Sequence, residues 1–169
     1  MKQPNLSARH TVLLIGEGKT EQVFFKHLKS LYIFRGCGVA VKIHAAKGKG
    51  PEYIVNYAVR RSRRFESERI LTLLDTDIAI KDSVRKQADE HNIQLVESEP
   101  CFEGLLLAML GKSVPRTSKQ CKQQCGKIFS APLTTQESYQ ELLTRDILDQ
   151  RRSNIPALSK ILDSFFFDD

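Results

Sequence analysis

Short apolar runs alternate with amphipathic segments along the first two thirds of the chain, and this alternation constrains the fold more than any other feature of the sequence. Four runs have the length and composition of buried strands: residues 11–15, 39–44, 69–77 and 93–98. The segments after them carry apolar residues at helical spacing, most clearly over 24–31, 51–64 and 80–91. This order predicts an α/β fold in which helices cover both faces of a mainly parallel β-sheet.

The length of the chain, 169 residues, suits one domain with its own core and is too short for two sizeable ones. The alternating pattern ends near Gly111, so we expect an α/β core over residues 1–111. Residues 112–169 are then expected to form a polar, irregular arm and two helices, at about 136–150 and 155–166. This C-terminal helical tail is expected to pack on the core.

Signals for membrane insertion or secretion are absent from the sequence. No apolar run approaches the roughly 20 residues of a membrane-spanning helix, and the N-terminal stretch MKQPNLSARH lacks an apolar signal segment. We therefore expect a soluble, cytoplasmic protein with no membrane partner. The four cysteines form no C-x-x-C pair and have no histidine cluster beside them, which favours reduced thiols over a zinc site.

Positive charge is concentrated in the first part of the chain. Residues 1–75 carry fourteen Lys and Arg against six Asp and Glu, whereas the remaining residues carry a net charge of −2. A basic half suggests a polyanionic partner such as nucleic acid. Many ordinary cytosolic domains are equally basic, so charge alone does not decide the question.

A Gly-Lys-Thr triplet follows the first predicted strand, where a nucleotide-binding P-loop could lie. A P-loop needs G-x-x-x-x-G-K-[ST], because four residues between the glycines let the backbone amides curl around phosphates. The first glycine of that motif would stand at position 13, which is Leu13 in the apolar run, and Glu17 lies between Gly16 and Gly18 instead. A carboxylate repels a triphosphate, so the sequence argues against an ATPase.

Acidic residues follow three of the four predicted strands. Glu17 follows the first strand, Asp75 and Asp77 follow the third, and the segment 98–103 follows the fourth. Ligands of open parallel sheets gather at the carboxyl ends of the strands. We therefore expect these acids to share one rim of the sheet.

Asp75 and Asp77 lie one residue apart, directly after a buried strand. Two such carboxylates repel each other unless a cation lies between them. Oxygen ligands of this kind suit Mg²⁺ or Mn²⁺. The alternative is a solvated turn in which Asp77 caps the next helix.

Two further acids, Glu103 and Glu21, lie in the first turns of predicted helices. The helix that carries Glu103 is apolar nearly all round, so its carboxylate is expected to be buried and to need a cation. Alternatively, either acid only complements the dipole of its helix.

Basic and aromatic residues follow the second predicted strand. Lys47 and Lys49 lie on a glycine-rich loop that could meet a phosphate or could simply be solvated. A stripe on the next helix combines two tyrosines with two arginines: Tyr53, Tyr57, Arg60 and Arg64. Such a stripe can stack bases and bind phosphates, although a charged stripe is often only a solvated face.

Three motifs together resemble known families. The E-G-x-T-E motif at residues 17–21 and the D-x-D motif at 75–77 resemble the Toprim domain of the overcoming-lysogenization-defect nucleases and their relatives. The stretch SEPCFEGLLLAML at 98–110 is similar to the S-x-P-C-F-E-x-x-L-L motif of the bacterial RloB-like family. That family is a small Toprim-type group linked to restriction and abortive-infection loci.

The resemblance implies a single Toprim-like domain that acts as a metal-dependent nuclease on DNA or RNA in a bacterial defence system. It implies two Mg²⁺ or Mn²⁺ ions held by Glu17, Asp75 and Asp77, with Glu103 as a ligand or base and Glu21 in support. Relatives lie beside ATPase genes, so a partner ATPase is also expected. The alternative is a non-catalytic Toprim-like subunit that docks on an ATPase or on nucleic acid.

Overall fold

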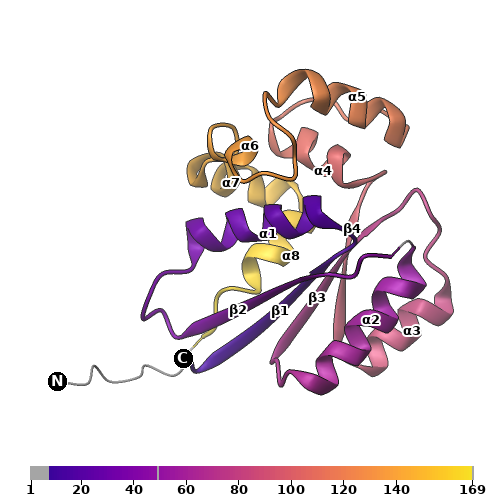
Figure 1. Ribbon diagram of the computed structural model, residues 1–169, viewed down its shortest axis with the longest axis vertical. Helices are drawn as coiled ribbons and strands as arrows, with labels where there is room; N and C mark the ends of the chain where they lie inside the picture. The colour runs from indigo at the N-terminus through magenta and orange to yellow at the C-terminus, as the bar shows by residue number, and fades with distance from the viewer. Residues whose placement is uncertain (1–7, 49, 169) are drawn as a thin grey trace.

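The computed structural model describes residues 8–48 and 50–168, and a four-stranded parallel sheet lies at its centre (Figure 1). The strands are β1 (His10–Gly16), β2 (Val39–Ala45), β3 (Arg69–Asp75) and β4 (Ile93–Ser98). They lie in the order β2-β1-β3-β4, and all three pairings are parallel. The predicted α/β fold is confirmed, with strand bounds that closely match the apolar runs.

Helices cover both faces of the sheet, as the alternating pattern predicts (Figure 1). On one face lie α2 (Pro51–Arg64) and α3 (Asp82–Glu90), which bury Leu13 and Ile15 of β1. On the other face lies α1 (Lys19–Tyr32), over Val12 and Leu14. Alternate residues of β1 therefore pack into two separate cores, which explains why residues 12–15 of the strand are all apolar.

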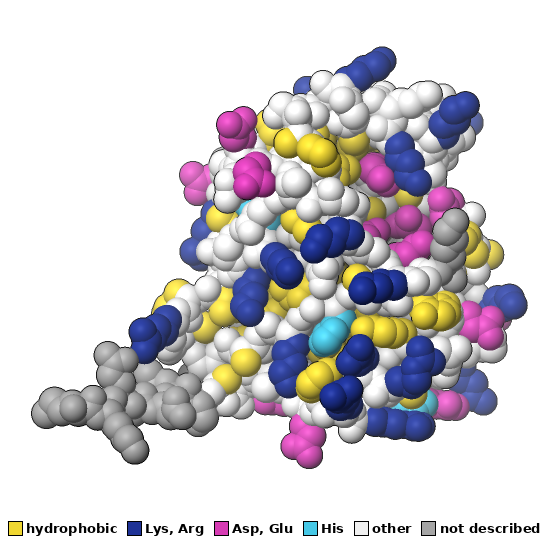
Figure 2. Space-filling model, viewed as in Figure 1, with side chains coloured by type: hydrophobic (Ala, Val, Ile, Leu, Met, Phe, Trp, Pro, Cys, Tyr) yellow, Lys and Arg dark blue, Asp and Glu magenta, His cyan; other side chains and the backbone are white. Residues whose placement is uncertain are grey.

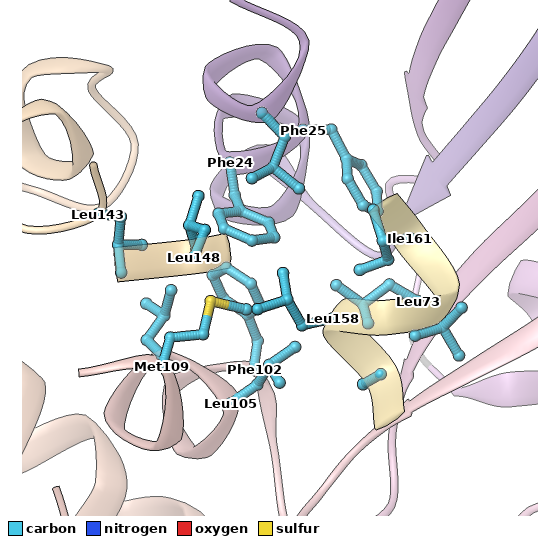
Figure 3. Packing of buried hydrophobic residues seen from close by; sticks show 14 of the residues in the cluster. Phe24, Phe25, Leu73, Phe102, Leu105, Met109, Leu143, Leu148, Leu158 and Ile161 are labelled. Carbon is cyan, nitrogen blue, oxygen red and sulfur yellow. The ribbon is translucent and has the colours of Figure 1, made fainter. Parts of the chain in front are cut away.

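The larger core lies on the α1 side and includes the C-terminal helices (Figure 3). Helix α4 (Phe102–Met109) contributes Phe102, Leu105 and Met109, and α8 (Pro156–Asp163) inserts Leu158 and Ile161 beside them. All five side chains are almost completely buried. Residues far apart in the sequence thus form one hydrophobic cluster.

The segment after Gly111 is more helical than the sequence indicates. The arm expected to be irregular contains α5 (Ser118–Ile128), so that prediction is wrong over these residues. The side chain of Thr117 caps α5 by accepting a hydrogen bond from the N–H of Gln120, and Cys121 and Cys125 bury one face of the helix.

The single helix expected at 136–150 is divided into two. A short helix, α6 (Glu137–Gln140), is followed by α7 (Arg145–Arg151), a 3₁₀ turn at Arg152–Asn154 and then α8. Thr144 is extended, and its hydroxyl accepts a hydrogen bond from the N–H of Ile147. A threonine in this position begins a new helix, which is the physical reason for the break.

Strand β2 forms one edge of the sheet, and within the described residues it pairs only with β1. The ammonium of Lys29 in α1 donates a hydrogen bond to the Val41 carbonyl of this strand, at 2.9 Å. Lys42, the next residue of β2, is exposed. None of the helices in the described residues is both long enough and apolar enough to cross a membrane.

Candidate functional site

The five predicted acids meet at the carboxyl edge of the sheet. Asp75 ends β3 beside Ser98 at the end of β4, and Glu17 directly follows β1. Four other carboxylates lie close enough to Asp75 to raise its pKa: Glu21, Glu17, Asp77 and Glu103. The structure therefore brings together acids that are up to 86 positions apart in the sequence, between Glu17 and Glu103.

Glu21 folds back over the turn between β1 and α1. Its carboxylate accepts a hydrogen bond from the N–H of Gly18, at 3.0 Å, and so caps the start of α1. A side chain at Gly16 would place its Cβ only 2.4 Å from the Cβ of Glu21, so this tight turn requires glycine. A P-loop holds phosphate at a helix N-terminus, whereas here a carboxylate of the same helix lies there.

The pKa of Asp75 is raised from its usual value of 3.8 to about 7. Burial is the largest cause, followed by the negative charges of the four neighbouring acids. Burial also raises the pKa of Glu21, and the charge of Glu103 adds to the effect. A cluster of this kind favours protonation or a bound cation, because either one relieves the repulsion.

The loops after β3 and β4 are joined by hydrogen bonds. The N–H groups of Thr76 and Asp77 both donate to the Pro100 carbonyl, at 3.1 and 2.9 Å. Asp77 itself is exposed, and its carboxylate accepts a hydrogen bond from the Ser118 hydroxyl in α5, at 2.6 Å. Helix α3 begins five residues later with Lys81 at its N-cap, so Asp77 does not cap that helix.

Glu103 lies in the first turn of α4 and is half-buried. Its neighbours Phe102, Gly104 and Leu105 are buried, as the apolar sequence predicts. Glu103 lies near the positive end of the helix dipole and also beside the acid cluster, so its position does not decide between the two sequence interpretations. The charge of Glu103 also affects Cys125 in α5. Burial raises the pKa of the Cys125 thiol to about 12, and the negative charge of Glu103 adds to this shift.

A family model for RloB-like proteins matches residues 12–158, which is most of the chain and includes all five acids. The chain belongs to the RloB-like family. No curated protein and no solved structure matches it significantly.

The acid cluster of this RloB-like protein has the donor chemistry of a Mg²⁺ or Mn²⁺ site, because all its ligands would be carboxylate oxygens. Within the described residues, however, no three His, Cys, Asp or Glu side chains converge on a single point as metal ligands do. Asp77 is bonded to Ser118, and Glu21 is bonded to Gly18. A shared cation would therefore require some of these side chains to change rotamer.

Of the predicted basic and aromatic residues, Lys47 lies at this rim, whereas the stripe on α2 begins near the rim and continues away from it toward Arg64. Lys47 is exposed and adopts a left-handed backbone conformation, and its N–H donates to the Glu17 carbonyl at 2.9 Å. Lys49 lies outside the described residues. The four residues of the predicted stripe, with Arg61, line a hollow of about 300 Å³: Tyr53, Tyr57, Arg60 and Arg64.

Figure 2 shows Lys and Arg side chains gathered over β2 and α2, with Asp and Glu side chains gathered above them near the carboxyl edge of the sheet. The sequence interpretation missed two participants in this region. Arg61 lies one position off the expected stripe, and Ser118 lies 41 residues from the aspartate that it contacts. Helical periodicity could have indicated Arg61, whereas no local pattern indicates Ser118.

Proposed function

We propose that this RloB-like protein is a metal-dependent nuclease that hydrolyses phosphodiester bonds of DNA or RNA in a bacterial defence or abortive-infection system. One observation carries the proposal: five carboxylates lie together at the carboxyl edge of a parallel sheet, where burial and then the charges of its four neighbours raise the pKa of Asp75 to about 7. Structural ion pairs would lower a carboxylate pKa, whereas the repulsion within this cluster is relieved by a proton or by a bound cation.

Each acid has a role in the proposed site. Asp75, Asp77 and Glu17 hold Mg²⁺ or Mn²⁺, as two ions, and Glu103 is a further ligand or the base that accepts the proton of the attacking water. Glu21 supports the turn that presents Glu17, through its bond to Gly18. When bound, such ions stabilise the charge that develops on the phosphate and lower the pKa of a coordinated water.

The test is the Asp75→Asn variant, since the amide has the same shape but lacks the charge that a hard cation needs. We expect it to abolish Mn²⁺-dependent cleavage of a mixed DNA and RNA substrate panel, and also the rise in melting temperature that Mn²⁺ gives the wild type. Asp89→Asn, at an exposed acid of α3, is the matched control and should leave both signals unchanged. Wild-type cleavage by Asp75→Asn would contradict the proposal.

A second candidate is a non-catalytic subunit that docks on a partner ATPase or on nucleic acid. It is favoured by the observation that no three acidic or other metal-binding side chains converge within the described residues. The same melting experiment separates the two functions. A nuclease gains thermal stability from Mn²⁺ through Asp75, whereas a docking subunit shows the same melting temperature with and without the ion.

A further inference from the structure

The basic surface of the molecule extends beyond the stripe on α2 to the edge strand β2. Lys42 and His44 pair in register with Leu13 and Ile15, whose side chains pack beneath α2. Side chains at paired positions of a sheet share a face, so Lys42 and His44 lie on the α2 side of the sheet. We call the combined surface the β2–α2 face; it consists of Lys42, His44, Tyr57, Arg60, Arg61, Arg64 and Phe65.

Two aromatic rings organise the cations of this face. The Phe65 ring, at the end of α2, lies 4.2 Å from the Lys42 ammonium, 5.6 Å from the His44 ring and 5.9 Å from the Arg64 guanidinium. The Tyr57 ring lies 5.0 Å from the Arg61 guanidinium, and its hydroxyl accepts a hydrogen bond from Arg61 Nε at 3.0 Å. Rings that hold cations in this way fix their positions on the surface.

The positive charge of this face is not balanced by acids. No carboxylate of the described residues lies within ion-pair distance of Lys42, Arg60, Arg61 or Arg64, although ion pairs occur elsewhere on the surface. The pKa of His44 is lowered, first by burial and then by the charges of Arg61 and Lys42. Like charges held together without counter-charges are the electrostatic footprint of a polyanion site.

The face also leads to the acid cluster. From Arg64 to Tyr53, α2 extends for about 16 Å toward the rim of the sheet. At that rim the loop after β2 is bonded to the loop after β1, through Ala46 N–H to the Gly16 carbonyl and Lys47 N–H to the Glu17 carbonyl, both at 2.9 Å. A polymer bound along α2 from Arg64 to Tyr53 would therefore end beside the loop that carries Glu17.

We propose that the β2–α2 face binds a single strand of nucleic acid and delivers it to the acid cluster. The hollow between Tyr53, Tyr57 and the arginines offers a place where an unpaired base can stack, while the surrounding cations bind phosphates. A duplex keeps its bases stacked inside and would use the cations alone. This inference rests on the proposed function, because the bound strand would be the substrate of the nuclease. Binding of the strand can nevertheless be measured without metal and without cleavage.

The test is the affinity of short oligothymidylate, measured by fluorescence anisotropy in EDTA over a series of salt concentrations. Arg64→Gln should weaken binding about tenfold and reduce the slope of log K against log salt by about 0.7, the value for one phosphate contact on a single strand. Arg63→Gln is the matched control, because Arg63 is exposed on the same helix but does not line the hollow. It should bind within about twofold of the wild type.

Stacking is tested separately with Tyr57→Leu, which keeps an apolar side chain and removes the ring. We expect a loss of about fivefold or more for oligothymidylate and none for an abasic strand of the same length. A melting curve shows that each variant is folded. Equal binding of duplex, inorganic polyphosphate and single strand, or equal losses for Arg63→Gln and Arg64→Gln, would overturn the proposal.

The two proposals fail in distinguishable ways. If the strand binds as described but Mn²⁺ never promotes cleavage, the nuclease proposal fails and the binding face stands. If the wild type cleaves nucleic acid and the variants of the face bind and cleave as well as the wild type, the face is not the route to the site.

Discussion

At the scale of single residues, Asp75 has the environment that departs most from that of an ordinary surface acid. Its pKa is raised to about 7 by burial and by Glu21, Glu17, Asp77 and Glu103. The folded protein therefore binds a proton at this carboxyl more tightly than the unfolded chain does. Between about pH 4 and pH 7, this residue makes the folded state less stable as the pH rises.

The expected result is a pH-dependent difference between wild type and Asp75→Asn in EDTA. The two should have similar unfolding free energies at pH 4, where Asp75 is neutral, and the variant should be more stable by about 1 to 3 kcal/mol at pH 8, allowing for solvent screening. Urea unfolding across this pH range measures the difference. A difference between the two proteins that does not change with pH would contradict the raised pKa of Asp75.

The acids of the site could be predicted from sequence because their motifs are local and follow strands. The β2–α2 face could be predicted only in part. The stripe from Tyr53 to Arg64 follows from helical spacing, but its partners Lys42 and His44 lie on a strand, and only the sheet order places β2 at the edge beside α2. A contact between a helix and a strand produces no repeating pattern of residues in a single sequence.

At the scale of secondary-structure elements, the packing of α4 on the preceding loop depends on Gly104. A Cβ added there would lie 2.6 Å from the Glu99 carbonyl oxygen and 2.9 Å from Cδ of Pro100. The first of these neighbours is backbone and cannot move aside cheaply. Since the Pro100 carbonyl also accepts the hydrogen bonds from Thr76 and Asp77, a displaced loop would disturb the acid cluster.

Gly104→Ala should therefore destabilise the protein by about 1 to 3 kcal/mol, as overpacking typically does. Gly126→Ala provides the contrast, because Gly126 lies inside α5 and its added Cβ would meet nothing within 4 Å. Alanine there should stabilise the protein by about 0.5 to 1 kcal/mol through better helix propensity. Thermal melts of the two variants measure both changes. Equal changes in stability for the two variants would show that the backbone at Glu99 can accommodate a side chain at position 104.

Helix α5 was not predicted because its sequence, SKQCKQQCGKI, is polar apart from two cysteines and a terminal isoleucine. The burial of Cys121 and Cys125 gives the helix its apolar face, and tertiary contact with α4 stabilises it. Propensity alone is a weak guide in such a segment. The cap at Thr117 and the spacing of the two cysteines are the signals that could have indicated it.

At the scale of the whole molecule, the sheet separates two hydrophobic cores that share β1. Ile54 fills the core beneath α2, whereas Leu158 of α8 fills the core beneath α1, and both are at most 1% exposed. The residues after Gly111 supply much of the second core. The arrangement predicts that the chain unfolds as one unit, although its C-terminal helices lie beyond the alternating pattern.

Leu158→Ala and Ile54→Ala should each lower the unfolding free energy by about 2 to 5 kcal/mol, because each leaves a cavity in a packed core. Both variants should still unfold in a single transition that coincides by circular dichroism and by tyrosine fluorescence, since Tyr139 lies in the C-terminal part of the larger core. An early, separate transition in Leu158→Ala would instead show that residues 112–169 unfold independently of the α/β core.

The lysines at the edge of the sheet have a further consequence, for how copies of the protein behave beside one another. An unpaired edge strand is a template onto which another chain can add a strand, the first step toward fibrous aggregates. Lys29 already occupies the Val41 carbonyl of β2, and Lys42 extends from the same strand. A second β2 would have to displace one ammonium and approach another, so the addition of a further strand at this edge of the sheet is disfavoured.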